Sequence, residues 1–111
     1  MSRKAPVARI TLVQLRTGDD LSPPIDRMPD FFARAADLRA DLVVFPEYVL
    51  GHHITPDDDV AIRFFELARK HQIYAITGCV EKHGQDQWAT SAWVVDRSGN
   101  LSGRYLKSHP A

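Results

Sequence analysis

Glu47 is the first residue whose position suggests chemistry. It follows the apolar run 42–45 (LVVF) and Pro46, so it stands just past the end of a predicted buried strand. Ligands of open α/β sheets bind beyond the carboxyl ends of the strands, and the proline stiffens the backbone at this exit. A half-buried carboxylate there would have a pKa raised by desolvation, which suits a general base. Position alone slightly favours the alternative, a carboxylate that caps or salt-bridges a loop.

Lys107 is the second candidate. It ends the stretch GRYLK, which follows a glycine turn and a short predicted strand. An ammonium group at this place could neutralise Glu47 or stabilise an oxyanion. The alternative is a solvated surface lysine, which is what most lysines are.

Other reactive side chains have simpler interpretations. His52 and His53 precede the acidic run 57–59, but adjacent histidines usually point apart and no third ligand has a motif spacing, so we expect no metal site. The acidic run is explained by the positive end of a helix dipole. Cys79 lies within the apolar stretch ITGCV, and no motif supplies a partner histidine, so we expect a structural thiol.

The elements that must position these residues alternate between strands and helices. Pro29 is expected in the first turn of the first helix, because a proline inside a helix costs ~3 kcal/mol. Thr55 is the predicted N-cap of the second helix, with Pro56 as its first residue. The order β-α-β-α-β-β-β predicts a parallel sheet that ends in an antiparallel hairpin. The five strands are expected at residues 7–15, 42–45, 73–80, 88–96 and 101–106.

Composition excludes several classes of function. Lys+Arg and Asp+Glu number 14 each, so the net charge of +0 gives no support to nucleic-acid or anionic-membrane binding. No apolar run approaches the ~20 residues that span a bilayer, the N-terminus has no secretory signal pattern, and a single cysteine fits a reducing, cytoplasmic setting. The sequence contains no GxGxxG motif, so no dinucleotide cofactor is expected. Trp88 and Trp93 are expected to pack on the sheet.

Taken in order, these segments resemble the nitrilase, or carbon–nitrogen hydrolase, superfamily. The resemblance rests on VARITLVQL, AADLRADLVVFPEYVLG, ITGCVEKHG and WATSAWVVDRSGNLSGRYLKSHP, which together cover nearly the whole chain. FPE and GRYLK at this separation are the most specific pair. The resemblance implies an α/β fold, the α-β-β-α sandwich of the nitrilase type, with only the N-terminal portion present.

The resemblance also implies a chemistry. Carbon–nitrogen hydrolases act on non-peptide bonds of small amides, carbamoyl compounds or nitriles through a Glu-Lys-Cys triad and a thioester acyl-enzyme. Glu47 would be the general base that takes the thiol proton, and Lys107 would stabilise the tetrahedral intermediate. A homo-oligomer is expected of the full-length protein.

One departure from the family pattern governs the functional prediction. The family nucleophile follows the lysine at the exit of a later strand, whereas this chain ends four residues after Lys107. Cys79 matches a small-residue position, so we expect the nucleophilic cysteine to be absent. Residues 1–111 would then be the N-terminal part of a single hydrolase domain, inactive alone and with a bare apolar sheet face.

Two alternatives stay open at this point. The chain could be a non-catalytic α/β binding or oligomerisation module. It could also be an unrelated small α/β ligand-binding domain in which Glu47 and Lys107 form a structural ion pair. The family interpretation requires the two side chains to converge on one pocket at the carboxyl end of the strands, and an unrelated fold does not.

Overall fold

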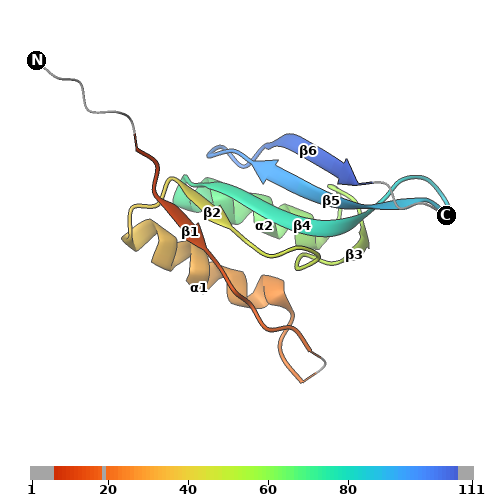
Figure 1. Ribbon diagram of the computed structural model, residues 1–111, viewed down its shortest axis with the longest axis horizontal. Helices are drawn as coiled ribbons and strands as arrows, with labels where there is room; N and C mark the ends of the chain where they lie inside the picture. Colours follow the sequence, from red (N-terminus) through yellow and green to blue (C-terminus); the bar gives the residue numbers. More distant parts are fainter. Residues whose placement is uncertain (1–6, 19, 108–111) are drawn as a thin grey trace, which may run out of the picture.

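The computed structural model describes residues 7–18 and 20–107, so the basic N-terminal segment and the end of the GRYLKSHP motif lie outside it. Within these residues, two helices and six strands follow one another (Figure 1). Their order is β1 (Ile10–Leu12), α1 (Pro24–Asp37), β2 (Leu42–Val44), β3 (His52–Ile54), α2 (Asp59–His71), β4 (Tyr74–Lys82), β5 (Trp88–Val95) and β6 (Leu101–Lys107).

All six strands form one mixed sheet. The order is β1-β2-β4-β5-β6, with β3 paired to β4 beyond the end of β2. β1, β2, β3 and β4 run parallel, while β5 pairs antiparallel with both β4 and β6. The predicted parallel sheet with a terminal antiparallel hairpin is therefore confirmed, and the long strand β4 is the element on which the others are assembled.

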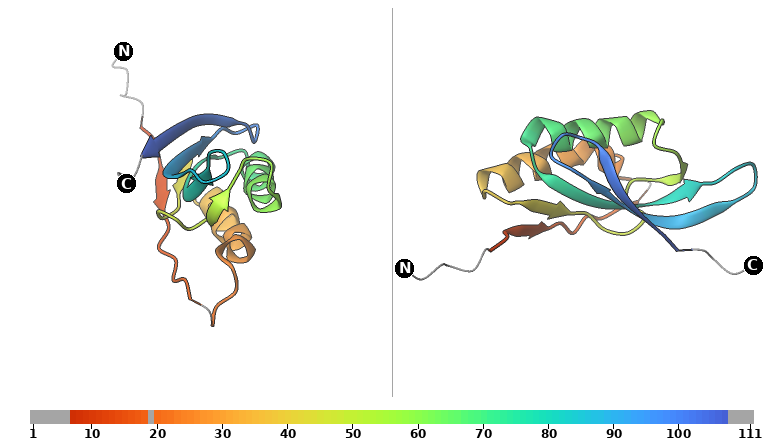
Figure 2. Two further views of the ribbon diagram at one scale, coloured as in Figure 1. Left: turned by 90° about the vertical axis from the view of Figure 1, so that its right-hand side faces the viewer. Right: turned by 90° about the horizontal axis from the view of Figure 1, so that it is seen from above.

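Both helices cover the same face of the sheet (Figure 2). The core between helices and sheet is aromatic: the ring centroids of Phe32 and Phe45 are 5.4 Å apart, and Phe64 lies within 5.7 Å of both. Phe32 and Phe64 are fully buried. Such rings contribute burial of apolar area together with favourable edge-to-face geometry, and this core fixes the position of the sheet.

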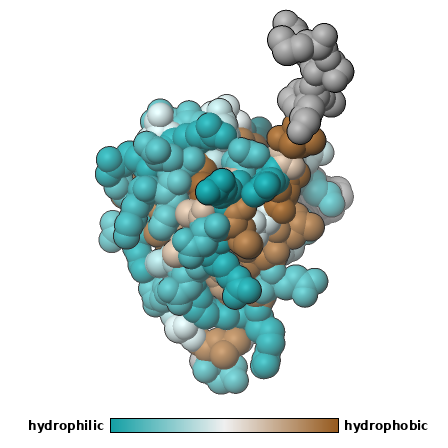
Figure 3. Space-filling model, turned by 90° about the vertical axis from the view of Figure 1, so that its left-hand side faces the viewer, coloured by the Kyte–Doolittle hydropathy of each residue, from teal (hydrophilic) through white to brown (hydrophobic). Residues whose placement is uncertain are grey.

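The opposite face of the sheet carries apolar side chains that no other element of the described residues covers. The strand register aligns these side chains across the sheet. Their neighbours along each strand, Val43, Ala75 and Val95, point into the core, so alternation places these side chains on the opposite face. Leu12 is 75% exposed and Tyr105 is 71% exposed. Brown side chains gather on this side of the molecule (Figure 3). We call this surface the open face; it comprises Ile10, Leu12, Leu42, Val44, Tyr74, Ile76, Val94 and Tyr105.

Helix α1 begins earlier than its sequence predicts. It starts at Pro24, and Pro29 lies inside it. An interior proline lacks the N–H that would bond to the carbonyl of Ile25, at a cost of ~3 kcal/mol. Packing outweighs that cost, because Ile25 and Met28 are 6% and 0% exposed and each buried side chain contributes about 1.5–3 kcal/mol.

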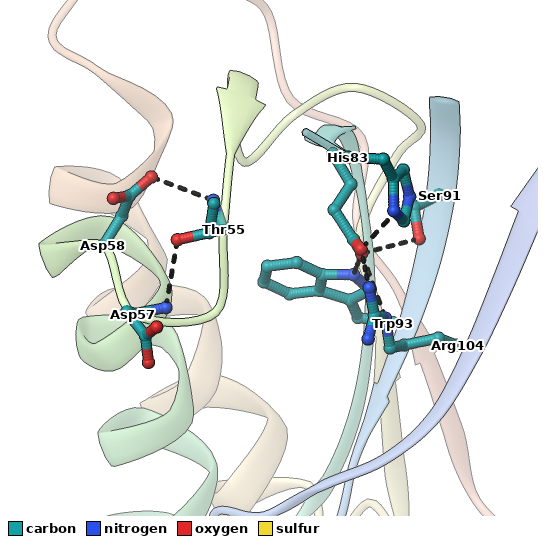
Figure 4. Close-up of polar contacts among 8 residues, drawn as sticks. Thr55, Asp57, Asp58, His83, Ser91, Trp93 and Arg104 are labelled. Carbon is teal, nitrogen blue, oxygen red and sulfur yellow. Dashed lines mark hydrogen bonds and ion pairs between the residues drawn. The ribbon is translucent and has the colours of Figure 1, made fainter. Parts of the chain in front are cut away.

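Helix α2 begins later than predicted, with Asp58 rather than Thr55 as its N-cap. The Thr55 backbone N–H donates to Asp58 Oδ2 at 2.9 Å, and the Asp57 N–H donates to Thr55 Oγ1 at 3.3 Å (Figure 4). These bonds make a closed turn before the helix, so the threonine hydroxyl caps the turn instead. The short strand β3, which precedes this turn, was not predicted at all.

Candidate active site

Glu47 lies in a segment that leaves the sheet between β2 and β3. The Phe45 N–H donates to the carbonyl of Ile76 at 2.8 Å, and the Leu50 N–H donates to the carbonyl of Gly78 at 3.0 Å. Both ends of the segment are thus tied to the same edge of β4, two residues apart. The four residues between Phe45 and Leu50 must therefore loop out over β4, and this loop carries Glu47.

Gly78 makes room for that loop. A Cβ atom at this position would come within 2.7 Å of the Cα of Glu47 and 2.8 Å of the backbone nitrogen of Tyr48. Both are backbone atoms that cannot move aside easily. Only a glycine lets the loop cross β4 here, so Gly78 sets where Glu47 stands. The sequence predicted a strand through ITGCV but gave no reason for its glycine.

Lys107 reaches the same pocket from β6, which is separated from β4 by the strand β5. It is the last residue of β6 and lies in register with Thr90 of β5. Glu47 and Lys107 line one pocket of about 210 Å³. Its other lining residues are Phe45, Ile76, Thr77, Gly78, Thr90, Ser91, Ala92 and Tyr105. We call it the Glu47–Lys107 pocket.

Glu47 and Lys107 converge on one pocket at the carboxyl end of β2, which is the geometry that the family resemblance requires. Within residues 7–18 and 20–107, no ion pair joins them. A carboxylate and an ammonium that face a common space without neutralising each other can act on a bound molecule.

Burial of Glu47 differs from the prediction. The sequence suggested a half-buried carboxylate, whereas the side chains of Glu47 and Lys107 are both exposed. The reason is that the pocket opens onto the open face of the sheet, where the described residues provide one wall only. Desolvation of the carboxylate would require a second layer over this face.

Comparison with known proteins identifies the family. The sequence pattern of carbon–nitrogen hydrolases matches residues 9–111. This chain belongs to the carbon–nitrogen hydrolase family. Nitrilase 1 of Arabidopsis thaliana is 26% identical over 132 aligned positions, which cover 92% of this chain and 38% of that protein.

Solved structures of the family share the fold. The carbon–nitrogen hydrolase from Helicobacter pylori G27 superposes with a TM-score of 0.77 at 20% identity, covering 92% of this chain and 40% of that one. A glutamate-to-glutamine variant of the amidase from Nesterenkonia sp. AN1 has a TM-score of 0.75 at 25% identity, covering 90% and 42%. The predicted nitrilase-type fold is confirmed, and the chain spans about two fifths of the length of these relatives.

Cys79 lies on the other side of β4 from the pocket. Its side chain is fully buried in the core beneath the helices, and it is not among the residues that line the Glu47–Lys107 pocket. Burial raises the pKa of the thiol to about 12, against a smaller lowering by the charge of Arg104. A thiol in this state is protonated near neutral pH and cannot meet a substrate in the pocket, as expected of a structural cysteine.

The two adjacent histidines do not point apart as the sequence suggested. A register irregularity in β3 gives His53 a φ of 56°, and His52 and His53 line one pocket with Trp88. Trp93 is fully buried on the sheet as predicted, whereas Trp88 is 47% exposed. In the part of the chain that the structure describes, no group of three His, Cys, Asp or Glu side chains could hold a metal ion.

Glu81 lies one residue beyond the predicted strand 73–80 but belongs to β4, where its side chain is 1% exposed. Trp93 Nε1 donates to its carboxylate at 2.5 Å, and Arg104 Nε donates at 3.2 Å and also forms an ion pair with it. His83 and Ser91 lie against the same group (Figure 4). The Arg104 contact crosses β5 and holds β6 to β4, so it supports the strand that presents Lys107. Glu81 follows Cys79 by two residues, and side chains two apart on a strand share a face. This spacing is the sequence signal that could have placed Glu81 on the buried face of β4.

A larger groove of about 550 Å³ lies between α1 and α2, on the helical side of the molecule. Its two arginines are engaged in ion pairs, Arg63 with Asp26 and Arg69 with Glu66. No serine, cysteine or histidine lines it. It offers no chemistry comparable with that of the Glu47–Lys107 pocket.

Neither helix of the described chain is long and apolar enough to cross a membrane.

Proposed function

We propose that this chain carries two of the three catalytic groups of a hydrolase that acts on small amides, carbamoyl compounds or nitriles. One observation carries the proposal: Glu47 and Lys107, which come from separate segments, line one pocket at the carboxyl end of β2. Membership of the carbon–nitrogen hydrolase family supplies the class of reaction. The proposed substrate is a small molecule, and the proposed setting is the cytoplasm.

The two residues have complementary roles in the proposed reaction. The Glu47 carboxylate takes the proton of a cysteine thiol, and the thiolate attacks the carbonyl carbon of an amide. The Lys107 ammonium stabilises the oxyanion of the tetrahedral intermediate. The C–N bond then breaks, ammonia leaves with a proton returned by Glu47, and a thioester remains. Water, deprotonated by Glu47, hydrolyses the thioester and restores the thiol.

A cysteine other than Cys79 is the proposed nucleophile. Cys79 is buried on the opposite side of β4, so the thiol must come from sequence outside these 111 residues. In the Nesterenkonia amidase, the acetamide moiety of fluoroacetamide is added covalently at the active-site cysteine, which supports thiol chemistry on this fold. We therefore propose that residues 1–111 form the N-terminal part of one hydrolase domain, and that the complete protein forms a homo-oligomer.

The first experiment is to sequence the reading frame beyond the codon for Ala111. We expect it to continue and to encode another apolar strand followed by a cysteine. In the complete protein, Glu47→Gln should lower kcat for ammonia release by about 10²–10⁴-fold, because the base that activates the thiol is lost. Glu66→Gln, which changes an exposed glutamate on α2, is the matched control and should leave kcat unchanged.

Two results would count against the proposal. Full activity of Glu47→Gln would remove the general-base assignment. Ammonia release by the 111-residue chain itself, abolished by Cys79→Ser, would show that the nucleophile had been assigned wrongly.

A further inference from the structure

A second pocket adjoins the Glu47–Lys107 pocket on the same side of the sheet. It has a volume of about 310 Å³ and is lined by Tyr48, His52, His53, Val80 and Trp88. Four of these five side chains are rings, and the fifth, Val80, is a buried aliphatic residue on β4. We call this the aromatic pocket. None of its residues takes part in the proposed reaction.

The rings form two walls. Tyr48 and His52 are stacked, with their planes 4° apart and their centroids 6.0 Å apart. His53 and Trp88 face each other at 6.1 Å with their planes inclined by 57°. Tyr48 is 41% exposed, so its ring presents surface to a ligand as well as to its neighbour. The rings of Tyr48 and His53 are positioned by backbone conformations with positive φ, which do not occur in regular strands.

Backbone strain is concentrated at this pocket. Tyr48 has a φ of 62° and His53 a φ of 56°, in the left-handed region that non-glycine residues avoid at a cost of about 1–2 kcal/mol. Within the described ranges, only Arg39 and Gln72, which follow the two helices, share this feature. A helix end explains those two residues. It does not explain Tyr48 and His53, and their conformations instead turn their rings toward one pocket.

The two pockets share a boundary. Tyr48 directly follows Glu47, and Thr90 Oγ1 donates a hydrogen bond to Tyr48 Oη at 3.3 Å. Thr90 lines the Glu47–Lys107 pocket and lies in register with Val80 on one side and Lys107 on the other. Neighbouring strands are about 4.8 Å apart, so Val80 and Lys107 are separated by about 10 Å. A molecule whose amide lies between Glu47 and Lys107 can extend a ring over Val80.

We propose that the aromatic pocket binds a flat aromatic group, and that the substrates of this site are amides or nitriles with an aryl group on the acyl side. This inference rests on the proposed function for the position of the amide. The ring faces of Tyr48 and Trp88 favour stacking by about 0.5–1.5 kcal/mol beyond the burial of apolar area. None of the five lining residues carries a carboxylate, so a cationic group would find no counter-charge there.

Binding to the Leu12→Lys form of the 111-residue chain, in which a charge on the open face opposes self-association, tests the inference without requiring catalysis. Three probes are compared by saturation-transfer NMR titration: phenylacetamide, cyclohexylacetamide and acetamide. The first two have rings of similar size, but only the first is flat. We expect phenylacetamide to bind at least about five-fold more tightly than cyclohexylacetamide, and acetamide to bind most weakly. Equal affinity for the two ring compounds would overturn the inference.

Variants localise the binding. Trp88→Leu and Tyr48→Leu, which keep an apolar side chain but remove the ring, should each weaken phenylacetamide binding by about five-fold. Trp88→Phe should retain binding, which separates the loss of a ring from a loss of folding. Tyr74→Leu is the matched control, because Tyr74 is also 41% exposed and lies on the open face outside the pocket. Equal weakening by the Tyr74 variant, or none by the other two leucine variants, would contradict the site.

The inference and the proposed function can fail separately. If phenylacetamide binds as expected but the complete protein releases no ammonia from any amide, only the proposed function is contradicted. If the complete protein hydrolyses acetamide and phenylacetamide with equal kcat/KM and the probes show no preference, only the aromatic pocket is contradicted.

Discussion

The Cys79 thiol should be inert in the folded chain. It is fully buried, and burial raises its pKa to about 12, so almost no thiolate forms at pH 8. We expect no labelling by a disulfide reagent such as dithionitrobenzoate at pH 8, and rapid labelling in urea, where the pKa returns to about 8.5. Cys79→Ala supplies the blank. Labelling of the native chain as fast as that of the unfolded chain would contradict the assignment of Cys79 to the core.

The same pKa difference sets a direction for stability. Between about pH 8.5 and pH 12, the unfolded chain loses the thiol proton while the folded chain keeps it. The contribution of Cys79 to the free energy of unfolding therefore falls as the pH rises through this window. Below pH 8.5 the contribution is fully present.

Residue chemistry was the part of the site most open to prediction from sequence. Glu47 follows a short apolar strand and Lys107 follows a short predicted strand, and the local pattern indicates what such a residue can do. The exposure of Glu47 was predicted wrongly, because burial depends on what covers the open face and no local pattern describes that. Tyr48 and Trp88 were missed as a pair, since their meeting depends on the bulge in β3.

At the scale of the element, the crossing of the Glu47 loop over β4 depends on Gly78. We expect Gly78→Ala to destabilise the chain by about 1–3 kcal/mol, because the new Cβ would lie 2.7 Å from the Cα of Glu47 and the loop must shift. Gly103→Ala in β6 is the matched control. Its Cβ would make ordinary contacts of 3.5 Å and 3.6 Å with Val94 and should cost less.

Urea unfolding of the two glycine variants measures the difference. A Gly78→Ala variant as stable as Gly103→Ala would mean that the loop does not pack on β4 as described. A stable Gly78→Ala variant in the complete protein should still lose activity, since the displaced loop carries the proposed general base.

Apart from the missed strand β3, element types followed from the sequence, but element boundaries did not. The alternation of apolar runs and the turn residues near Gly99 were sufficient for the sheet and its hairpin. The start of α1 was misplaced because local propensity penalises Pro29, while the burial of Ile25 and Met28 more than offsets that penalty. The start of α2 was misplaced because Thr55 bonds within a turn instead of capping the helix.

At the scale of the whole molecule, the described residues form no second layer over one face of the sheet. Monomeric soluble proteins rarely expose large contiguous apolar patches, and strands at a sheet edge present unpaired backbone groups. The open face combines both features along β1, whose side chains Ile10 and Leu12 are 55% and 75% exposed. The sequence predicted such a bare face through the family resemblance. Its members could be identified only from the register of the strands.

The isolated 111-residue chain should therefore self-associate through the open face. We expect its weight-average mass in sedimentation equilibrium to rise with concentration, and Leu12→Lys to shift it toward the monomer, because a charge on the edge strand opposes both apolar contact and strand pairing. Ile62→Lys is the control: Ile62 is 46% exposed but belongs to α2, on the helical side. A concentration-independent monomer, or equal effects of the two lysines, would mean that the open face does not drive association. The position of Leu12 on the same face as the Glu47–Lys107 pocket gives the result a functional meaning, because a layer that covers this face would also desolvate Glu47.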